Sequence, residues 1–211
     1  MQETDTPASG AAPGVDGAGP ARPPAESALI LIDQQHCMQA LGTEQRNNHD
    51  AEALIAALLG VWRQRQWPVV HVRHISRSET SGFRPGQSGA AFQEAFMPLA
   101  HEAVFEKNVP DAFTQSALER WLHVRGIRHL MIVGVASENS VENSARSAGN
   151  LGFTVWVPEA ACYTFAKPDY AGVWHSASEV HAMAMANLDG EYANVVDRAW
   201  LLAALEGWQA E

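Results

Sequence analysis

The segment HLMIVGVASENSVENSARSAGNLGF, residues 129–153, decides the fold. Its first half is an apolar run that predicts a buried β-strand. The polar residues 137–140 follow directly, and a helical pattern then runs from Ser140 to Leu151. A buried strand that passes through a short polar turn into a helix is typical of an α/β protein. The pattern also leaves one hydroxyl, that of Ser140, at the start of the helix.

The remainder of the chain repeats this alternation. Short apolar runs predict strands at 28–33, 68–74, 104–107, 129–135, 154–160 and 193–197. Helical spacing predicts helices at 51–66, 114–125, 140–151, 176–188 and 199–208, with Thr114 and Ser176 or Ser178 as N-caps and Gly126 as a C-cap. An irregular loop with one short helix near 90–96 fills residues 76–103. This order predicts an α/β fold in which helices cover both faces of a mostly parallel sheet.

The first 26 residues differ in composition from the rest. They are rich in Ala, Gly and Pro, lack the charged and apolar regions of a secretory signal, and offer little large apolar surface to offset their ordering entropy. We therefore predict a disordered tail at 1–26. A chain of 211 residues, 46% of them hydrophobic, can build one sizeable core, so we predict a single domain at 27–211.

Charge and cysteine content narrow the class of protein. The 24 acidic and 14 basic residues give a formal net charge of −10 with no basic stripe, so we expect neither nucleic acid nor a membrane as a partner. No apolar run approaches the roughly 18 residues of a membrane span. The two cysteines, Cys37 and Cys162, form neither a disulfide framework nor a paired metal motif, which favours a cytoplasmic protein.

Three polar residues follow predicted strands. They are Asp33, Lys107 and Ser140, and because ligands of parallel sheets bind beyond the carboxyl ends of the strands, they are candidates for one site. A hydroxyl at a helix N-terminus lies beside N–H groups that stabilise an oxyanion. Asp33 would be its base, and Lys107 would keep that base ionised. Each residue alone has a simpler interpretation, Asp33 as a strand-end cap and Ser140 as an N-cap.

Other catalytic patterns do not occur in the sequence. It contains no G-x-S-x-G elbow, Walker loop or G-x-G-x-x-G fingerprint. His71 and His74 lie three apart on a predicted strand, so their side chains point to opposite faces and are poor ligands for one metal.

Three segments resemble, in this order, the isochorismatase-like, or cysteine hydrolase, superfamily over residues 27–200. They are ALILIDQQ (28–35), FEKNVPDAF (105–113) and GVASENSVENSARSAGNLGF (134–153). The resemblance implies a three-layer α/β/α fold with a central, mostly parallel sheet of five or six strands, assembled as a homodimer or homotetramer. It implies a hydrolase with Asp33 as general base, Lys107 as charge-stabilising group and Ser140 at the nucleophile position. It also implies a cis peptide at Val135–Ala136 and an oxyanion hole formed by the N–H groups of Ala136 and Ser140.

The chain departs from the family pattern at the nucleophile. Most members have cysteine where this chain has Ser140, and a hydroxyl is much harder to deprotonate than a thiol beside a cation. Three interpretations remain open. They are a hydrolase that cleaves the C–N bond of a small amide through Ser140, an enol-ether hydrolase that forms no covalent intermediate, and a catalytically idle binder of a small ligand. Residues 139–153 resemble a natural branch of the family, which favours a native serine over an engineered replacement of cysteine.

The metal-binding residues of nicotinamidase members are also missing. His74 and Ser76 stand where those members carry an Asp-x-His pair, so we expect no metal and no cofactor.

Apolar and aromatic residues near the same strand ends are candidate walls of a pocket for a small, planar substrate. We predict that the substrate contacts Met38, His74, Phe113, Tyr163 and Phe165, with Trp174 as a further candidate. Each could instead belong to the core or to a subunit contact. Arg84 is a candidate partner for a substrate carboxylate, and a solvated arginine is the alternative. Cys37 and Cys162 are candidates for a displaced nucleophile, against the alternative of small packing residues.

Overall fold

The computed structural model describes residues 21–24, 26–42 and 45–210. Most of the predicted N-terminal tail therefore lies outside the described residues. The strands are β1 (Ala28–Ile32), β2 (Val69–His74), β3 (Ala103–Lys107), β4 (His129–Val135), β5 (Thr154–Pro158), β6 (Cys162–Tyr163), β7 (Lys167–Pro168), β8 (Trp174–His175) and β9 (Asn194–Val196). The helices are α1 (His36–Gln39), α2 (Ala51–Arg65), α3 (Leu118–Val124), α4 (Glu142–Asn150), α5 (Ala177–Leu188) and α6 (Arg198–Ala210).

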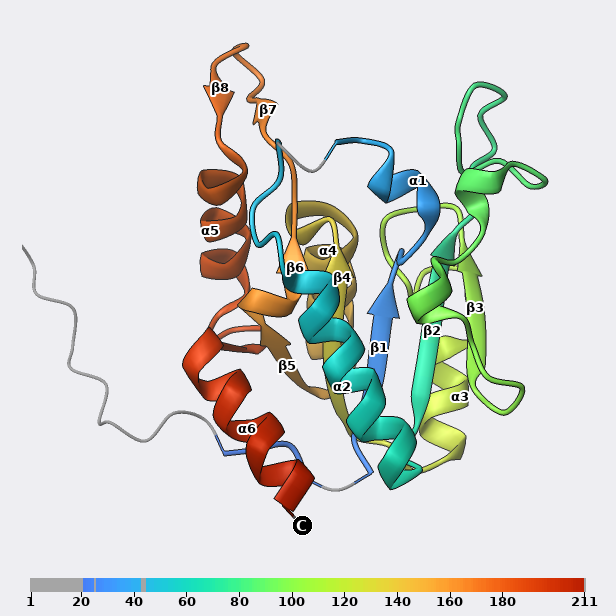
Figure 1. Ribbon diagram of the computed structural model, residues 1–211, viewed down its shortest axis with the longest axis vertical. Coiled ribbons are helices and arrows are strands. Elements are labelled where there is room, and N and C mark those ends of the chain that lie inside the picture. Colours follow the sequence, from blue (N-terminus) through green and yellow to red (C-terminus); the bar gives the residue numbers. More distant parts are fainter. Residues whose placement is uncertain (1–20, 25, 43–44, 211) are drawn as a thin grey trace, which may run out of the picture.

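The central sheet has the strand order β3-β2-β1-β4-β5-β9, with β6 added beside the end of β4 (Figure 1). Every pair in it is parallel. The predicted parallel α/β sheet is confirmed. It has seven strands, where five or six were predicted, since the two-residue strand β6 was not expected. The chain order reverses direction at β1 and β4, which makes the carboxyl ends of these strands the expected place for a ligand.

The two faces of the sheet bury two separate apolar clusters. Alternate residues of one strand serve both, because successive side chains of a strand point to opposite faces. On β1, Ile30 packs with residues of α3, α4 and α5, whereas Leu29 and Leu31 pack with α2 and α6. Each fully buried side chain of this size contributes roughly 1.5–3 kcal/mol. The result is the predicted three-layer α/β/α arrangement, with α2 and α6 in front of the sheet in Figure 1.

The helix predicted to begin at Thr114 begins instead at Leu118. Thr114 lies four residues before this start, and its hydroxyl donates to Asp111. The Ser116 hydroxyl accepts from the Leu118 N–H at 3.2 Å instead. The predicted C-terminal glycine is confirmed, because Gly126 follows α3 with φ +69° and its N–H donates to His123 O at 3.0 Å.

The N-cap of α5 is also as predicted. Ser176 Oγ accepts from the Glu179 N–H, and the Glu179 carboxylate accepts from the Ser176 N–H in return. These two bonds form a capping box, in which each residue satisfies a backbone donor of the other.

The junction after β4 differs from the prediction in one respect. The helical path begins at Ser137 with a π-helical turn, Ser137–Val141, and α4 then starts at Glu142. We call Ser137–Val141 the nucleophile turn. Ser140 therefore lies inside a turn and does not cap a helix. Just before it, Gly134 has φ +132°, and a Cβ there would lie 2.2 Å from Ile32 O, so β4 approaches the end of β1 this closely only with glycine.

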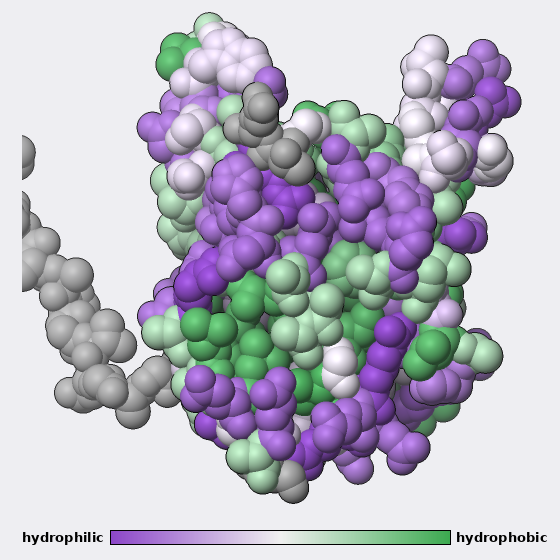
Figure 2. Space-filling view, viewed as in Figure 1, coloured by the Kyte–Doolittle hydropathy of each residue, from purple (hydrophilic) through white to green (hydrophobic). Residues whose placement is uncertain are grey.

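Two projections stand above the body of the molecule. One is the β7–β8 hairpin, which exposes Tyr170, Val173 and Trp174, and the other is the loop after β2 (Figures 1 and 2). No helix within the described residues is long and apolar enough to cross a membrane.

Candidate active site

The three residues singled out by the sequence meet at the carboxyl edge of the sheet. Lys107 Nζ donates to Asp33 Oδ2 at 2.7 Å and to Ser140 Oγ at 3.0 Å. The residues come from the ends of β1 and β3 and from the nucleophile turn after β4. Asp33 is 1% exposed, Lys107 4% and Ser140 6%, so the cluster is almost closed to water in the single chain. Low exposure strengthens each electrostatic interaction among them.

Backbone geometry places Asp33. It follows β1 directly with φ +53°, a conformation that aspartate adopts more readily than most residues. Its N–H still donates to Val72 O at 2.9 Å, so the residue stays fastened to the sheet while the chain turns away. Lys107 is the last residue of β3 and lies opposite His74 in the strand register. The sheet thus brings the acid and the ammonium together from β1 and β3, across the end of β2, which lies between them.

Sequence reasoning missed the buried residue that fixes this edge. Gln35 is completely buried, and its side chain accepts from the His74 N–H at 2.7 Å and donates to His74 O at 3.0 Å and Ala90 O at 2.9 Å. It therefore ties the loop after β1 to the end of β2. The only signal in the sequence was a polar pair, Gln34 and Gln35, directly after an apolar strand.

The environment opposes ionisation of Asp33. Burial raises the pKa of its carboxyl above the ordinary value, while the Lys107 ammonium, the Ser140 hydroxyl and His74 act in the opposite direction. The second oxygen, Oδ1, is buried and has no hydrogen-bond partner among the described residues. The pKa of His74 is lowered, first by burial and then by Lys107. Asp33 is thus a carboxyl group with a raised pKa and one oxygen, Oδ1, that is free to take a proton.

Polar contacts hold the nucleophile turn on several sides. The N–H groups of Asn139 and Val141 both donate to Ala136 O at 3.1 Å. Lys167 Nζ donates to Glu138 Oε1 at 3.0 Å, and the Thr164 hydroxyl donates to the same carboxylate. The predicted cis peptide bond at Val135–Ala136 is present. The contacts of Glu138 were not predicted, because they come from residues near the base of the β7–β8 hairpin.

The predicted pocket walls divide into two groups. Met38 and Phe165 are partly buried and pack, with Ala136, against a small cluster beside the nucleophile turn. Their contact with substrate stays a prediction, as does that of His74, whose ring packs edge-on against Phe83.

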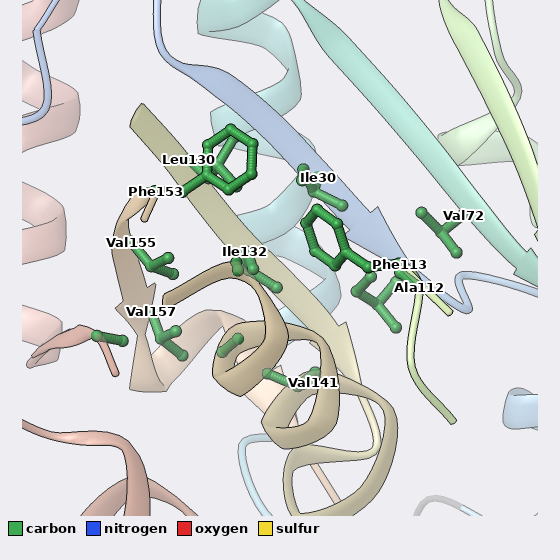
Figure 3. Close-up of a cluster of buried hydrophobic side chains, with 14 of the residues drawn as sticks. Ile30, Val72, Ala112, Phe113, Leu130, Ile132, Val141, Phe153, Val155 and Val157 are labelled. Atoms are coloured by element: carbon green, nitrogen blue, oxygen red, sulfur yellow. The ribbon is translucent and has the colours of Figure 1, made fainter. Parts of the chain in front are cut away.

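The other two predicted walls, Tyr163 and Phe113, are buried in the single chain. Tyr163 is fully buried, its ring lies 3.9 Å below the Arg46 guanidinium, and burial raises its pKa. Phe113 packs in the core cluster against Phe153, with ring centroids 6.0 Å apart (Figure 3). Their contact with substrate also stays a prediction. Trp174, 68% exposed on β8, lines no closed wall in the single chain.

The two cysteines are placed as packing residues. Cys162 is completely buried in β6 and burial raises the pKa of its thiol to about 12, so it carries no thiolate at neutral pH. Burial also raises the pKa of the half-buried Cys37, whose Sγ would lie 2.7 Å from a Cβ at Gly82. Neither thiol contacts the Asp33–Lys107–Ser140 cluster. Among the described residues, no three His, Cys, Asp or Glu side chains are grouped to hold a metal ion.

A cleft of about 580 Å³ opens beside the cluster. Its lining residues are Ile75, Ser76, Arg77, Arg84, Pro85, Glu106, Lys107 and Asn108. It includes Lys107 but neither Asp33 nor Ser140. It is therefore a neighbouring groove at the β2–β3 edge, and it places two arginines next to the buried ammonium.

Comparisons with known proteins show the family of this chain. The model of the isochorismatase domain family matches residues 27–199. A protein of the isochorismatase family from Chromobacterium violaceum has a crystal structure that superimposes with a TM-score of 0.81 at 42% identity, covering 89% of this chain and 99% of that one. The uncharacterized isochorismatase family protein YrdC of Bacillus subtilis is 30% identical over 171 residues, 81% of this chain and 91% of that one. The ureidoacrylate amidohydrolase RutB of Klebsiella pneumoniae is 27% identical over 168 residues, 60% of this chain and 71% of that one.

Proposed function

Because this chain belongs to the isochorismatase family of hydrolases, we propose that it cleaves the C–N bond of a small amide by covalent catalysis at Ser140. The observation that carries this proposal is the Lys107 ammonium, which donates to Asp33 and Ser140 at once in a buried cluster. An ammonium group has donors only, so Ser140 Oγ accepts from it and keeps its own proton to give away. The nearby carboxylate is the base that receives that proton.

The reaction follows from these positions. Ser140 Oγ attacks the amide carbonyl carbon as its proton passes to Asp33. Asp33 then protonates the leaving amine, the C–N bond breaks, and an acyl ester remains on Ser140. Water attacks the ester, Asp33 takes a proton from that water, and the carboxylic acid leaves as Ser140 Oγ recovers its proton. A raised pKa suits Asp33 to this exchange, because the group must bind and release a proton at near-neutral pH.

Positive charge and N–H groups stabilise the negative oxygen of the intermediate. We assign this role to Lys107 and to the N–H groups of Ala136 and Ser140. Lys107 does not need to move, since it already contacts the nucleophile. Preorganised donors of this kind typically contribute a factor of about 10²–10³ each to the rate.

The substrate that we propose carries a carboxylate as well as the amide. Arg84 projects into the cleft that Lys107 lines, and its guanidinium has no hydrogen-bond or ion-pair partner among the described residues. Arg77, on the same cleft, lies 2.7 Å from the side-chain amide of Asn108, whose oxygen accepts from it once the amide is turned over. A free guanidinium binds a carboxylate through two parallel hydrogen bonds. The name of the Klebsiella relative, an amidohydrolase of ureidoacrylate, is consistent with an anionic substrate.

Trapping the acyl intermediate tests the catalytic proposal. The protein is incubated with a panel of small carboxylated amides, quenched in acid and digested, and peptides that contain residues 136–146 are examined by mass spectrometry. We expect an acyl mass on Ser140 that disappears in Ser140→Ala. We also expect Ser140→Cys to be at least about tenfold faster, because Lys107 would lower the pKa of a thiol.

Two other outcomes would point to different functions. Turnover without an adduct, retained in Ser140→Ala, would indicate that Asp33 acts on water, as in enol-ether hydrolysis. Binding of an amide with no turnover, even in Ser140→Cys, would indicate a ligand-binding protein.

The carboxylate proposal has its own measurement. Arg84→Ala should raise KM for a carboxylated amide about tenfold or more and leave KM for its uncharged methyl ester analogue unchanged. Equal effects on both substrates would remove Arg84 from substrate recognition.

We also propose that the protein is a cytoplasmic homodimer or homotetramer. The exposed Tyr170, Val173 and Trp174 on the β7–β8 hairpin are the kind of apolar group that subunit contacts cover. Sedimentation velocity of the purified protein gives the assembly state, and a monomer at micromolar concentration would rule this out.

A further inference from the structure

A second polar cluster lies behind the nucleophile turn. The Ser137 hydroxyl is 2.7 Å from His181 Nδ1, and His181 Nε2 is 3.6 Å from Glu159 Oε2. Ser137 is the first residue of the turn, His181 lies on α5, and Glu159 follows β5. The three side chains thus join the segment that carries Ser140 to two elements outside it.

The order serine, histidine, carboxylate is that of a hydrolytic triad, but burial excludes attack on a substrate. Ser137 has no exposed surface and His181 is 7% exposed. A nucleophile must approach the carbonyl carbon to about 3 Å, which a hydroxyl sealed in the core does not do without opening the fold. The cluster therefore acts on the position of the turn.

Charge sets the direction of the hydrogen bonds. His181 lowers the pKa of Glu159, so the carboxylate stays ionised beside the imidazole. At 3.6 Å the Glu159 carboxylate is beyond hydrogen-bond distance of Nε2, which has no hydrogen-bond partner among the described residues, but its charge still favours the tautomer with the proton on that atom. Nδ1 is then an acceptor, and it takes the hydrogen bond of the Ser137 hydroxyl.

We propose that Ser137, His181 and Glu159 form a positioning chain that holds the nucleophile turn at the distance at which Ser140 meets Lys107. This inference rests on the proposed function, since it assumes that Ser140 is the reacting group. Ser137 precedes Ser140 by three residues in the same turn, and Lys107 contacts the turn through Ser140. Release of the Ser137 contact leaves the turn free to shift away from Lys107. A displacement of about 1 Å at a reacting group can cost about 100-fold in rate.

The test compares variants that break the chain with one that repairs it. Ser137→Ala and His181→Leu remove the hydrogen bond. His181→Asn places an amide where Nδ1 was and can still accept from Ser137. We expect the first two to lower kcat about 10- to 100-fold while KM changes less than about threefold, and His181→Asn to recover most of the loss. The double variant Ser137→Ala/His181→Leu should be no slower than either single variant, because both remove the same contact.

Ser144→Ala is the matched control. Ser144, on α4, is also a completely buried serine, and its hydroxyl accepts from the N–H of Ala112, between β3 and α3, at 3.0 Å. This variant should lose comparable stability and keep its kcat. An equal fall in kcat for Ser144→Ala and Ser137→Ala would overturn the positioning role and leave only general destabilisation. An acyl adduct found on Ser137 would overturn it as well.

A measurement that needs no turnover separates this inference from the proposed function. Amide hydrogen exchange, followed by mass spectrometry, should be about tenfold faster over residues 136–142 in Ser137→Ala and His181→Leu, and unchanged in His181→Asn. If the wild-type protein hydrolyses no amide, the proposed function fails while the exchange still decides whether the chain holds the turn. An unchanged rate of amide hydrogen exchange in all variants would overturn the proposed positioning role.

Discussion

Two buried carboxylates lie near the two ends of β3, and their surroundings differ. Glu102, just before the strand, accepts hydrogen bonds from Arg63 at 2.7 and 2.9 Å, from the Leu99 N–H at 2.8 Å and from His71 at 2.9 Å. Asp33, at the far end, accepts from Lys107 at 2.7 Å and interacts with the Ser140 hydroxyl, while its Oδ1 has no partner among the described residues. Both side chains are 2% exposed, although Asp33 is buried as a whole residue and Glu102 is only half-buried.

The number of donors sets the two pKa values apart. Burial alone would raise the pKa of Glu102, but Arg63, the Leu99 N–H and His71 outweigh it and lower the pKa to about 2. At Asp33 burial prevails over Lys107, and the pKa is raised. A fully satisfied carboxylate is a fixed charge that fastens two strands and a helix. An incompletely satisfied one is a group that exchanges protons, which is what a general base requires.

The largest expected difference between the two is catalytic. Asp33→Asn should lower kcat for the amide substrate by about 10²–10⁴, the usual contribution of a general base, while Glu102→Gln keeps kcat within about threefold. Steady-state kinetics of both folded variants at neutral pH make the comparison. An Asp33→Asn enzyme that is as fast as wild type would show that the incomplete hydrogen bonding of Asp33 has no catalytic purpose.

The sequence identified Asp33 as a candidate site residue but gave no signal for the role of Glu102. Asp33 could be found because it directly follows an apolar strand, and its partners Lys107 and Ser140 follow strands as well, so sheet topology alone places them at one edge. Their family motifs then supplied roles. Glu102 lies in a loop predicted to be irregular, and nothing local signals that His71 and Arg63, 31 and 39 residues away, will meet it.

The same limit applies to the residues around the site. Strands and helices follow local periodicity, so the longer ones were predicted, whereas the short α1, β6, β7 and β8 were not. Tyr163 and Phe113 were placed in the pocket because aromatic residues near strand ends suit a ligand wall. Their burial depends on tertiary neighbours, Arg46 above one ring and Phe153 beside the other. The Ser137–His181 contact also joins residues 44 apart, which no local pattern reveals.

For stability we expect the opposite order, with Glu102 contributing more to the free energy of unfolding than Asp33. The pKa of Glu102 falls from 4.5 to about 2, which corresponds to about 2–3 kcal/mol after allowance for solvent at Arg63, 26% exposed. Glu102→Gln should lose about that much free energy of unfolding in urea at pH 7. His71→Leu is a useful companion, since it tests whether the buried imidazole shares the loss. A Glu102→Gln protein as stable as wild type would mean that the network is not a structural fastener.

The pH dependence of stability should differ in sign. For Glu102 the folded pKa lies below the unfolded one, so its stabilisation is present above about pH 4.5 and is lost as the pH falls toward 2, by at most about 1.4 kcal/mol per pH unit. For Asp33 the folded pKa is raised, so protonation as the pH falls through it favours the folded state. Urea unfolding at pH 6, 4 and 3 should therefore show the advantage of wild type over Glu102→Gln shrinking with acid. Over the same range the free energy of unfolding of Asp33→Asn should fall relative to that of wild type.

The smallest effect is expected for a third carboxylate, Glu106, on β3 itself. Its comparison with Glu102 tests how much burial contributes to the strength of an ion pair with arginine. Glu106 also pairs with an arginine, Arg73, but its side chain is 54% exposed and that of Arg73 33%. Exposed ion pairs of this kind usually contribute less than about 1 kcal/mol, because water screens the charges and both side chains lose freedom. We expect Glu106→Gln to change the free energy of unfolding by less than about 0.5 kcal/mol and to leave kcat unchanged. A loss near that of Glu102→Gln would show that an arginine partner is enough without burial, and the contrast between the two ends of β3 would then need another cause.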